Sequence, residues 1–368
     1  MIFNNYQNFA RRDRQITKVF SRNETMHAIK LRRRRFRAHG FAALWAMLML
    51  GPAAMAGTGR SLAYVTNVNS NTVSVIDIGN NNTLVDTIPV GNGPQDIAVA
   101  PDGKHVYVTI FVDDGVSVID TATDRVVSTV PVGTRPEGIA VTPDGKHLYV
   151  ANRDSNTVSV IETAGNTVVN TVRVGAGPQA IALSPDGKHA YVANLRSDNV
   201  SVIDTDANRV LKTIAVGTAP VAIAVTPDGK QAYVANAGRA NQPSNLVSVI
   251  ETDDGAVAGT VMVGAYPNGV AVTPDGKYAY VANFFSGDVS VIETAGKRVM
   301  ARVAVGNSPS GIAVTPDGRQ VYVAGAPSDS VSVIETGGNT VASTFPAGVA
   351  AFHLGITPPP PKPPASPL

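Results

Sequence analysis

The stretch Pro143–Ile161 reads PDGKHLYVANRDSNTVSVI, and related copies of it recur along the chain. Its opening tripeptide, Pro-Asp-Gly, occurs six times at steps of 42, 42, 42, 47 and 42 residues. A period of this size indicates a repeat architecture in which each repeat is one supersecondary unit. The period therefore predicts the fold before any other feature is considered. The six copies begin at Pro101, Pro143, Pro185, Pro227, Pro274 and Pro316.

Each repeat contains four short runs rich in Val, Ile, Tyr and Thr, and Gly, Pro, Asn or Asp separates the runs. Such runs are typical of β-strands. Pro-Asp-Gly is a tight-turn signal because Pro presets φ and Gly supplies a positive φ. Four strands in about 40 residues are the composition of a β-propeller blade. We therefore predict an all-β fold with four-stranded blades.

The number of blades follows from counting the strands. The Tyr-Val and Val-Ser-Val-Ile segments each occur seven times, but the Ile-Ala-Val type of strand occurs only six times. The segment Gly348–Pro358 has the spacing of Gly306–Pro316, so Leu354–Thr357 is expected to supply the missing inner strand of the blade formed by residues 62–90. We predict a seven-bladed ring, closed by the C-terminal strand joining the first blade, because closure removes exposed sheet edges.

The motif Tyr64-Val65-Thr66-Asn67 recurs four times as Tyr-Val-Ala-Asn. On these residues the chain resembles the YVTN-type seven-bladed β-propeller repeat family, over Leu62–Pro358. The resemblance implies a propeller in an exported or cell-surface protein. It implies little about chemistry, since related propellers include binding modules, companions of redox enzymes, lactone-hydrolysing enzymes and single-strand DNA binders. Two copies depart from the motif, with Ile110 and Gly325 in the place of Asn.

The first 56 residues differ from the repeats in composition, with 11 Lys and Arg against two acidic residues. A basic block at Arg32–Arg35 precedes the apolar run Phe41–Leu50, and Ala54–Ala56 fits an A-x-A-like cleavage site. This order predicts a secretory signal. The apolar run is too short for a transmembrane helix. The segment Arg33–Phe36 weakly resembles a twin-arginine signal, which would mean export after folding.

The signal assignment sets the predicted domain boundaries. Residues 1–56 form the signal region, with Met26 as the translation start and cleavage after Ala56, and residues 57–358 form the propeller. Residues 359–368 are a Pro-rich tail that we expect to be disordered; a docking tail or wall-spanning spacer is the alternative. We expect the protein in the periplasm, secreted or at the cell surface, with no transmembrane segment after signal removal.

Signal removal also reverses the charge. The whole chain carries +2, whereas residues 57–368 hold 19 basic and 26 acidic residues, a net charge of −7. A net-negative domain binds polyanions poorly unless one face is locally basic. The only Trp, Trp45, lies in the signal, which leaves few platforms for stacking bases. Nucleic acid is therefore not an expected partner. The absence of cysteine excludes disulfides, thiolate metal sites and Cys nucleophiles.

Residues that every blade carries are expected to serve the scaffold. They include the acids that end all seven third strands, and the same expectation applies to the six aspartates of the Pro-Asp-Gly turns. The equivalent histidines His105, His147 and His189 are separated by whole blades, so we predict no metal site there. The repeats contain no P-loop, nucleophile elbow or His-Glu-x-x-His motif. We predict no cofactor and no metal.

Positions where the repeats differ are the candidates for a site. We look for them in the loops that lead into the inner strands, here called lead-in loops, and in the loops between second and third strands. In propellers both loop sets lie on one face, around the mouth of the channel. The predicted ligand-binding residues are His353, Asp96, Glu137, Arg135, Gln95, Gln179, Tyr266, Asn268, Phe284 and Phe285.

The sharpest site prediction joins His353, Asp96 and Glu137, which lie on three consecutive blades across the seam of the ring. Arg135 shares a loop with Glu137, so these four groups are expected to approach one another. Two acids beside a His can hold a hard cation or share acid–base work. An acid neighbour also favours the charged form of His353. The alternative is that His353 plugs the channel beside Phe352 and that the acids are solvated.

For function we predict a monomeric, exported scaffold that binds a partner protein or small ligand through the loop face without catalysis. The first alternative is a lactonase-like or other hydrolytic enzyme, which requires an acid, an amide and a His at the channel mouth. The second alternative is single-stranded nucleic-acid binding. It requires a continuous basic arc formed by Arg135, Arg153, Arg196 and Arg239.

Overall fold

The computed structural model describes residues 61–239, 241–306 and 308–359. Contacts divide the chain between Ala53 and Ala54, and all described residues belong to the second unit. They form 28 strands in seven four-stranded sheets, and every pairing is antiparallel. The predicted signal region, residues 1–56, and residues 360–368 of the predicted tail lie outside the described residues. Across the described segments, no helix is long and apolar enough to cross a membrane.

The seven inner strands line the centre of the ring. They are β28 (Ala351–Ile356), β4 (Pro94–Val99), β8 (Pro136–Val141), β12 (Pro178–Leu183), β16 (Pro220–Val225), β20 (Pro267–Val272) and β24 (Pro309–Val314). The second strands carry the Tyr-Val motif. They are β1 (Leu62–Asn67), β5 (His105–Ile110), β9 (His147–Asn152), β13 (His189–Asn194), β17 (Gln231–Arg239), β21 (Tyr278–Asn283) and β25 (Gln320–Gly325).

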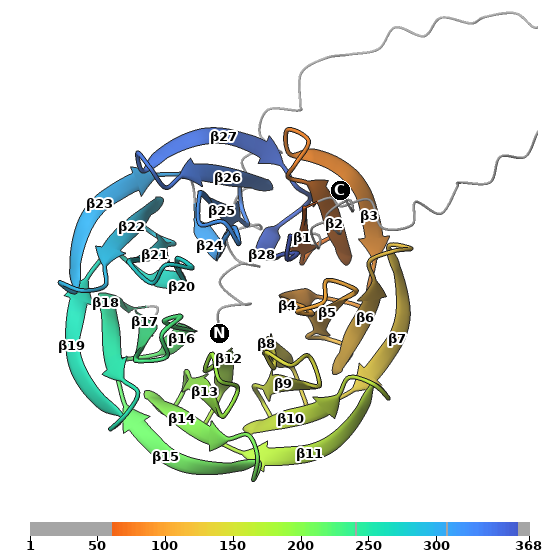
Figure 1. The fold of residues 1–368 in the computed structure, drawn as a ribbon, viewed down its shortest axis with the longest axis horizontal. Helices are drawn as coiled ribbons and strands as arrows, with labels where there is room; N and C mark the ends of the chain where they lie inside the picture. Colours follow the sequence, from red (N-terminus) through yellow and green to blue (C-terminus); the bar gives the residue numbers. More distant parts are fainter. Residues whose placement is uncertain (1–60, 240, 307, 360–368) are drawn as a thin grey trace, which may run out of the picture. The chain divides into compact units, whose positions relative to one another are not determined.

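The third strands carry Val-Ser-Val-Ile, and the fourth strands form the rim of the ring (Figure 1). The third strands are β2 (Thr72–Asp77), β6 (Gly115–Asp120), β10 (Thr157–Glu162), β14 (Asn199–Asp204), β18 (Gln242–Glu251), β22 (Asp288–Glu293) and β26 (Ser330–Glu335). The fourth strands are β3 (Thr83–Pro89), β7 (Arg125–Pro131), β11 (Thr167–Arg173), β15 (Arg209–Ala215), β19 (Ala256–Met262), β23 (Arg298–Ala304) and β27 (Thr340–Pro346).

The ring closes through the first blade, whose sheet has the order β28-β1-β2-β3. In this sheet Leu354 pairs with Val65. The end of the closing strand is fixed by Thr357, whose N–H donates to the Leu62 carbonyl oxygen at 2.9 Å and whose Oγ1 accepts from the Leu62 N–H at 2.9 Å. Each inner strand contacts the next around the ring, including β28 with β4 (Figure 1). The predicted seven-bladed ring and its closure by the C-terminal strand are therefore confirmed.

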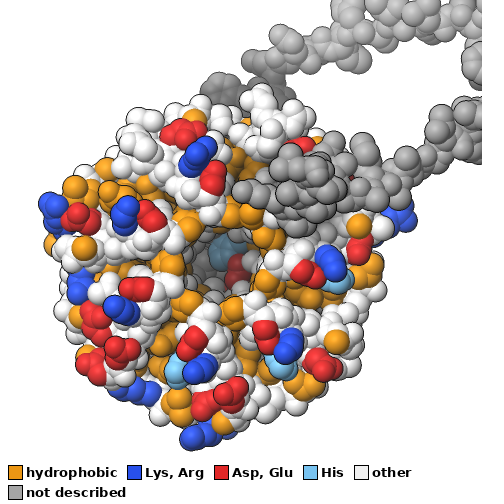
Figure 2. Space-filling model, viewed as in Figure 1, with side chains coloured by type: hydrophobic (Ala, Val, Ile, Leu, Met, Phe, Trp, Pro, Cys, Tyr) orange, Lys and Arg blue, Asp and Glu red, His pale blue; other side chains and the backbone are white. Residues whose placement is uncertain are grey.

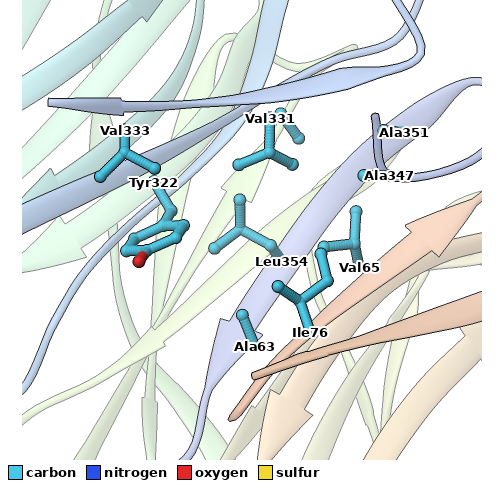
Figure 3. Close-up of a cluster of buried hydrophobic side chains, with 10 residues drawn as sticks. Ala63, Val65, Ile76, Tyr322, Val331, Val333, Ala347, Ala351 and Leu354 are labelled. Carbon is cyan, nitrogen blue, oxygen red and sulfur yellow. The ribbon is translucent and has the colours of Figure 1, made fainter. Parts of the chain in front are cut away.

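The hydrophobic core lies between neighbouring blades. At the seam, Leu354 and Val65 of the first blade pack in one buried cluster with Tyr322 and Val331 of the last blade (Figure 3). Analogous clusters form between the other neighbouring blades, because the alternating apolar residues of the middle strands face the adjacent sheet. The closing strand therefore completes the apolar contact between the first blade and the last, in addition to a sheet.

The motif asparagine is a scaffold residue. In the third blade Asn152 Nδ2 donates to Ser159 Oγ at 2.9 Å, and Asn152 Oδ1 accepts from the Gly133 N–H at 3.1 Å. A Cβ at Gly133 would lie 2.6 Å from Asn152 Cγ, so the loop needs glycine there. Where the motif has Gly325 instead, the matching Gly306 has no such neighbour within 4 Å.

Repeated acids of the blades accept hydrogen bonds within their own blade, many of them in turns. In the third blade Asp144 Oδ1 accepts from the Lys146 N–H at 3.0 Å and from the Thr142 hydroxyl at 2.6 Å. These hydrogen bonds hold the pKa of Asp144 below its ordinary value. At the end of a third strand, Asp204 Oδ1 likewise accepts two backbone N–H groups, each at 3.0 Å. These carboxylates therefore stabilise the turns of their blades.

Candidate functional site at the channel mouth

The lead-in loops and the loops between second and third strands lie on one face, as expected, and hydrogen bonds join them. The Arg153 N–H donates to the Arg135 carbonyl oxygen at 3.0 Å, and the Phe284 N–H donates to the Tyr266 carbonyl oxygen at 2.9 Å. Each bond joins a loop between second and third strands to a lead-in loop. Figure 2 shows a hollow at the centre of the ring, with histidine and carboxylate side chains visible inside it.

The residue immediately before each inner strand has a positive φ, although five of the seven are not glycine. Such a backbone costs roughly 1–3 kcal/mol per residue and persists where the surrounding structure fixes it. Arg135 (φ 52°) and Tyr266 (φ 58°) are the large side chains displayed in this way. The full set is Gly93, Arg135, Gly177, Ala219, Tyr266, Ser308 and Ala350.

The centre of the candidate site is the pair formed by His353 of β28 and Asp96 of β4. His353 Nδ1 lies 2.7 Å from Asp96 Oδ1, and the two side chains are 28% and 23% exposed. The carboxylate is held from two sides, because Oδ1 accepts the Ile97 N–H at 2.8 Å and Oδ2 accepts the Ile139 N–H at 3.1 Å. The imidazole is held by Phe352, whose ring stacks on it at 4.7 Å with an interplanar angle of 10°.

The electrostatic surroundings favour the protonated form of this histidine. Burial alone would lower the pKa of His353, but the adjacent Asp96 carboxylate and the more distant Glu137 outweigh it and raise the pKa above its ordinary value. The direction agrees with the expectation that an acidic neighbour favours the charged form of His353. The expected alternative, in which His353 only plugs the channel beside Phe352, does not explain the bond to Asp96.

The third predicted residue, Glu137 of β8, lies in an adjoining buried group. Arg153 Nη1 donates to Glu137 Oε1 at 2.7 Å, and both side chains are under 10% exposed. Gln179 Nε2 donates to Glu137 Oε2 at 3.0 Å. Burial raises the pKa of Glu137, and the neighbouring Arg153 and His353 only partly oppose this. Within the described residues, Arg153 Nε and Gln179 Oε1 are buried polar atoms without a hydrogen-bond partner.

The remaining arginines of the loop face are paired with acids. Arg135 and Arg196 share one carboxylate, Asp154, at 3.1 and 2.6 Å. Arg239 pairs with Asp198 at 2.9 Å. Arg135 therefore turns to Asp154 and has no recorded bond to Glu137, although the two share a loop. Four arginines facing three carboxylates are not the unpaired basic arc that single-stranded nucleic-acid binding requires.

An aromatic cluster lies on the same face, near the sixth blade. The Tyr266 ring lies 4.7 Å from Phe285 and 5.8 Å from Phe284, and Phe285 is 58% exposed. At the start of the inner strand β20 of this blade, Asn268 Nδ2 donates to Ser310 Oγ at 2.7 Å. The last predicted residue, Gln95, is buried beside Asp96 at 5% exposure.

Two recesses lie between blades, away from the His353 pair. One, of about 410 Å³, is lined by residues of the first and last blades, including Asn67, Ser74 and Phe345. The other, of about 300 Å³, has Asp113 as its only ionisable lining residue. Neither recess is lined by a histidine, so neither combines an acid with a base. Over the described segments, no group of three or more His, Cys, Asp or Glu side chains is arranged to hold a metal ion.

The model of the family "Lactonase, 7-bladed beta-propeller" matches the chain over residues 58–169, 135–212 and 167–298, which together span more than half of it. The chain belongs to this family. A search of curated proteins finds no match.

Several solved structures are similar to this chain. Hydrazine synthase of Kuenenia stuttgartiensis is 27% identical, with a TM-score of 0.65 over 71% of this chain and 88% of that one. A protein of unknown function from Desulfotomaculum acetoxidans DSM 771 is 19% identical, with a TM-score of 0.69 over 81% and 99% of the two chains. A candidate 6-phosphogluconolactonase from Bacteroides uniformis ATCC 8492 is 17% identical, with a TM-score of 0.70 over 82% and 100%. The last two show the fold alone.

Sequence reasoning missed two residues that touch the His353 pair. Thr66 Oγ1 accepts the His353 N–H, and Thr109 Oγ1 accepts the Asp96 N–H, each at 3.0 Å. The sequence does distinguish these two residues, because both occupy the third position of the Tyr-Val-x-Asn motif, where the five other blades have alanine. The partnership of Arg153 with Glu137 was also missed, because Arg153 was assigned to the basic arc.

Proposed function

We propose that this lactonase-family propeller hydrolyses a cyclic ester at the channel mouth, with His353 as the general base. The observation that carries the proposal is the 2.7 Å pair of His353 and Asp96, partly exposed and held by backbone N–H groups. The family match favours this hydrolytic alternative over a non-catalytic scaffold.

In the proposed reaction His353 Nδ1–H donates to Asp96, which leaves Nε2 free to take a proton from water. The hydroxide attacks the lactone carbonyl, and the ring C–O bond breaks. The imidazolium then returns its proton to the departing alkoxide, so that lactone and water give one hydroxy acid. Asp96 orients the imidazole and stabilises its charged form, the role that an acid has beside a catalytic histidine.

The buried group beside this pair suits substrate binding. Glu137 and Arg153 compensate each other's charge in a site sheltered from water, where an unpaired charge would be costly. The free Arg153 Nε is a donor and the free Gln179 Oε1 is an acceptor. Buried polar atoms in proteins are almost always hydrogen-bonded, so we propose that groups of the bound ester, or waters that it displaces, pair with these two atoms.

The test is turnover of γ- and δ-lactones by the purified protein, measured above the raised pKa of His353, where its imidazole is neutral, with the rate of spontaneous hydrolysis subtracted. His353→Ala is expected to lower kcat by about 10²- to 10⁴-fold, the usual contribution of a positioned base. His189→Ala, in a Pro-Asp-Gly turn, is the matched control and should have no effect. Turnover that survives in His353→Ala, or no wild-type turnover above background with any ring size, would refute the proposal.

We also propose that the mature protein begins near Gly57 and acts outside the cytoplasm as a monomer, in keeping with the YVTN-type repeat. The support is the order of basic, apolar and small residues before Gly57. N-terminal sequencing of the protein recovered from the producing cells tests this proposal. An intact Met1 or Met26 on cytosolic protein would contradict it.

A further inference from the structure

The third position of the Tyr-Val-x-Asn motif distinguishes two blades from the other five. It is threonine in the first two blades, as Thr66 and Thr109, and alanine in the rest. Both threonines are fully buried, at 0% exposure. The alanines are Ala151, Ala193, Ala235, Ala282 and Ala324.

The same two blades also differ from the other five in their inner strands. The second residue after the strand's first proline, or its equivalent in the closing strand, is His353 in the first blade and Asp96 in the second. In the five blades with alanine it is always glycine or alanine: Gly138, Ala180, Ala222, Gly269 and Gly311. Threonine therefore occurs in the two blades that have a large polar side chain at this position of the inner strand, and in no other.

Thr66 ties the first inner strand to the second. Its Oγ1 accepts the His353 N–H at 3.0 Å and donates to the Gln95 carbonyl oxygen at 2.8 Å. Gln95 directly precedes Asp96 in β4. The hydroxyl thus bridges the backbone at His353 to the backbone beside Asp96.

Thr109 repeats this arrangement one blade further on. Its Oγ1 accepts the Asp96 N–H at 3.0 Å and donates to the Glu137 carbonyl oxygen at 2.6 Å. The two hydroxyls therefore join three neighbouring inner strands, β28, β4 and β8, at the residues that carry His353, Asp96 and Glu137.

The hydroxyls act where the sheet leaves backbone groups unpaired. The register between β1 and β28 shifts between Val65 and Asn67, opposite His353. The register between β4 and β5 shifts between Pro94 and Ile97, so Asp96 has no strand partner. A buried N–H without an acceptor is unfavourable, and at both places a threonine supplies the acceptor. The third and last blades have a similar shift opposite Ala151 and Ala324, where Gly138 and Gly311 have no strand partner, so the threonines coincide with His353 and Asp96 and not with the shift alone.

We propose that Thr66 and Thr109 are positioning residues that set the stagger of the three inner strands and so hold His353 against Asp96. The inference rests on the proposed function for its catalytic meaning. Its structural content, the contact between imidazole and carboxylate, stands independently. A displacement of about 1 Å in a reacting group can cost around 100-fold in rate, so loss of either bridge is expected to be visible in kcat.

The test compares Thr66→Ala and Thr109→Ala with Thr66→Ser and Thr109→Ser. Alanine is the residue of five other blades, so these variants should fold, and serine retains the bridging hydroxyl. Thr142→Ala removes a comparable buried hydroxyl from a Pro-Asp-Gly turn and controls for stability alone. We expect kcat to fall by about 10- to 100-fold in the alanine variants, with KM changed less, and to recover in the serine variants.

A second measurement separates this inference from the proposed function. Imidazole NMR titration of His353, with the other three mature histidines as references, reports its contact with Asp96 whether or not any lactone is hydrolysed. In the alanine variants the pKa of His353 should fall toward its ordinary value, and the serine variants should restore it. If the wild type hydrolyses no lactone but the titration shifts as expected, the proposed function fails and the positioning role stands.

The positioning role is overturned if the titration of His353 is unchanged in both folded alanine variants. It is also overturned if serine fails to restore the titration, or if Thr142→Ala shifts it equally. Should an alanine variant not fold, Thr109→Val and Thr66→Val retain the side-chain volume without the hydroxyl and provide the same comparison.

Discussion

Removal of the closing strand should abolish stable folding. A chain ending at Ala350 lacks all of β28, including Leu354, which is 7% exposed in the seam cluster. Loss of one buried leucine side chain costs about 2–5 kcal/mol. Each backbone hydrogen bond between β1 and β28 that is lost costs roughly a further 0.5–1.5 kcal/mol. Together these losses reach the roughly 5–15 kcal/mol by which a typical domain is stable.

The assay is urea denaturation followed by circular dichroism, with size-exclusion chromatography to detect association through the opened edge. A chain ending at Pro358 retains Thr357 and the whole of β28, so its stability should be nearly unchanged. Leu354→Ala and Ile181→Ala, at equivalent positions, should each cost about 2–5 kcal/mol. A stable monomer with an unchanged midpoint after loss of β28 would refute closure by this strand.

Three further predictions concern charged groups. Asp96→Asn removes the charge that raises the pKa of His353, so His353 stays neutral to lower pH. The acid limb of a plot of kcat/KM against pH should therefore move to lower pH. An acid limb at the same pH would argue against the pairing of His353 with Asp96. Arg153→Ala leaves Glu137 buried without its cation and should cost about 3–5 kcal/mol in urea denaturation, most of it recovered by adding Glu137→Gln. The pKa of Asp228 in a Pro-Asp-Gly turn is lowered by a threonine hydroxyl and a backbone N–H, so its contribution is present above its ordinary pKa and is lost as pH falls through the lowered value. Asp228→Asn should therefore flatten the fall of the melting temperature in acid, and an unaltered acid profile would contradict this.

The sequence predicted the blades and their closure because both follow from spacing. A fixed period places each strand, and Gly348–Pro358 matched the preceding repeat closely enough to identify β28. The pairing of His353 with Asp96 was predictable for the same reason, since equivalent positions on adjacent inner strands lie near each other. Their role toward a ligand remains a prediction.

The side-chain partners were not predictable from the period. Glu137 was expected near Arg135, its neighbour in the loop, but the left-handed backbone at Arg135 directs that side chain to Asp154. Arg153 takes its place beside Glu137, because the loop between second and third strands bonds to the lead-in loop. Such choices depend on local backbone angles and on the stagger between sheets, which a repeat spacing does not contain.

Closure of the ring at its seam and formation of the candidate site are coupled events. His353 and Asp96 are 257 positions apart in the chain and meet only when β28 is in place. A ligand that binds this pair therefore binds only the closed ring, and it stabilises closure by mass action, by about 2.7 kcal/mol at a hundred times its Kd. A bound molecule would thus hold the ring closed, and its concentration would set the fraction of molecules in which the first blade is open.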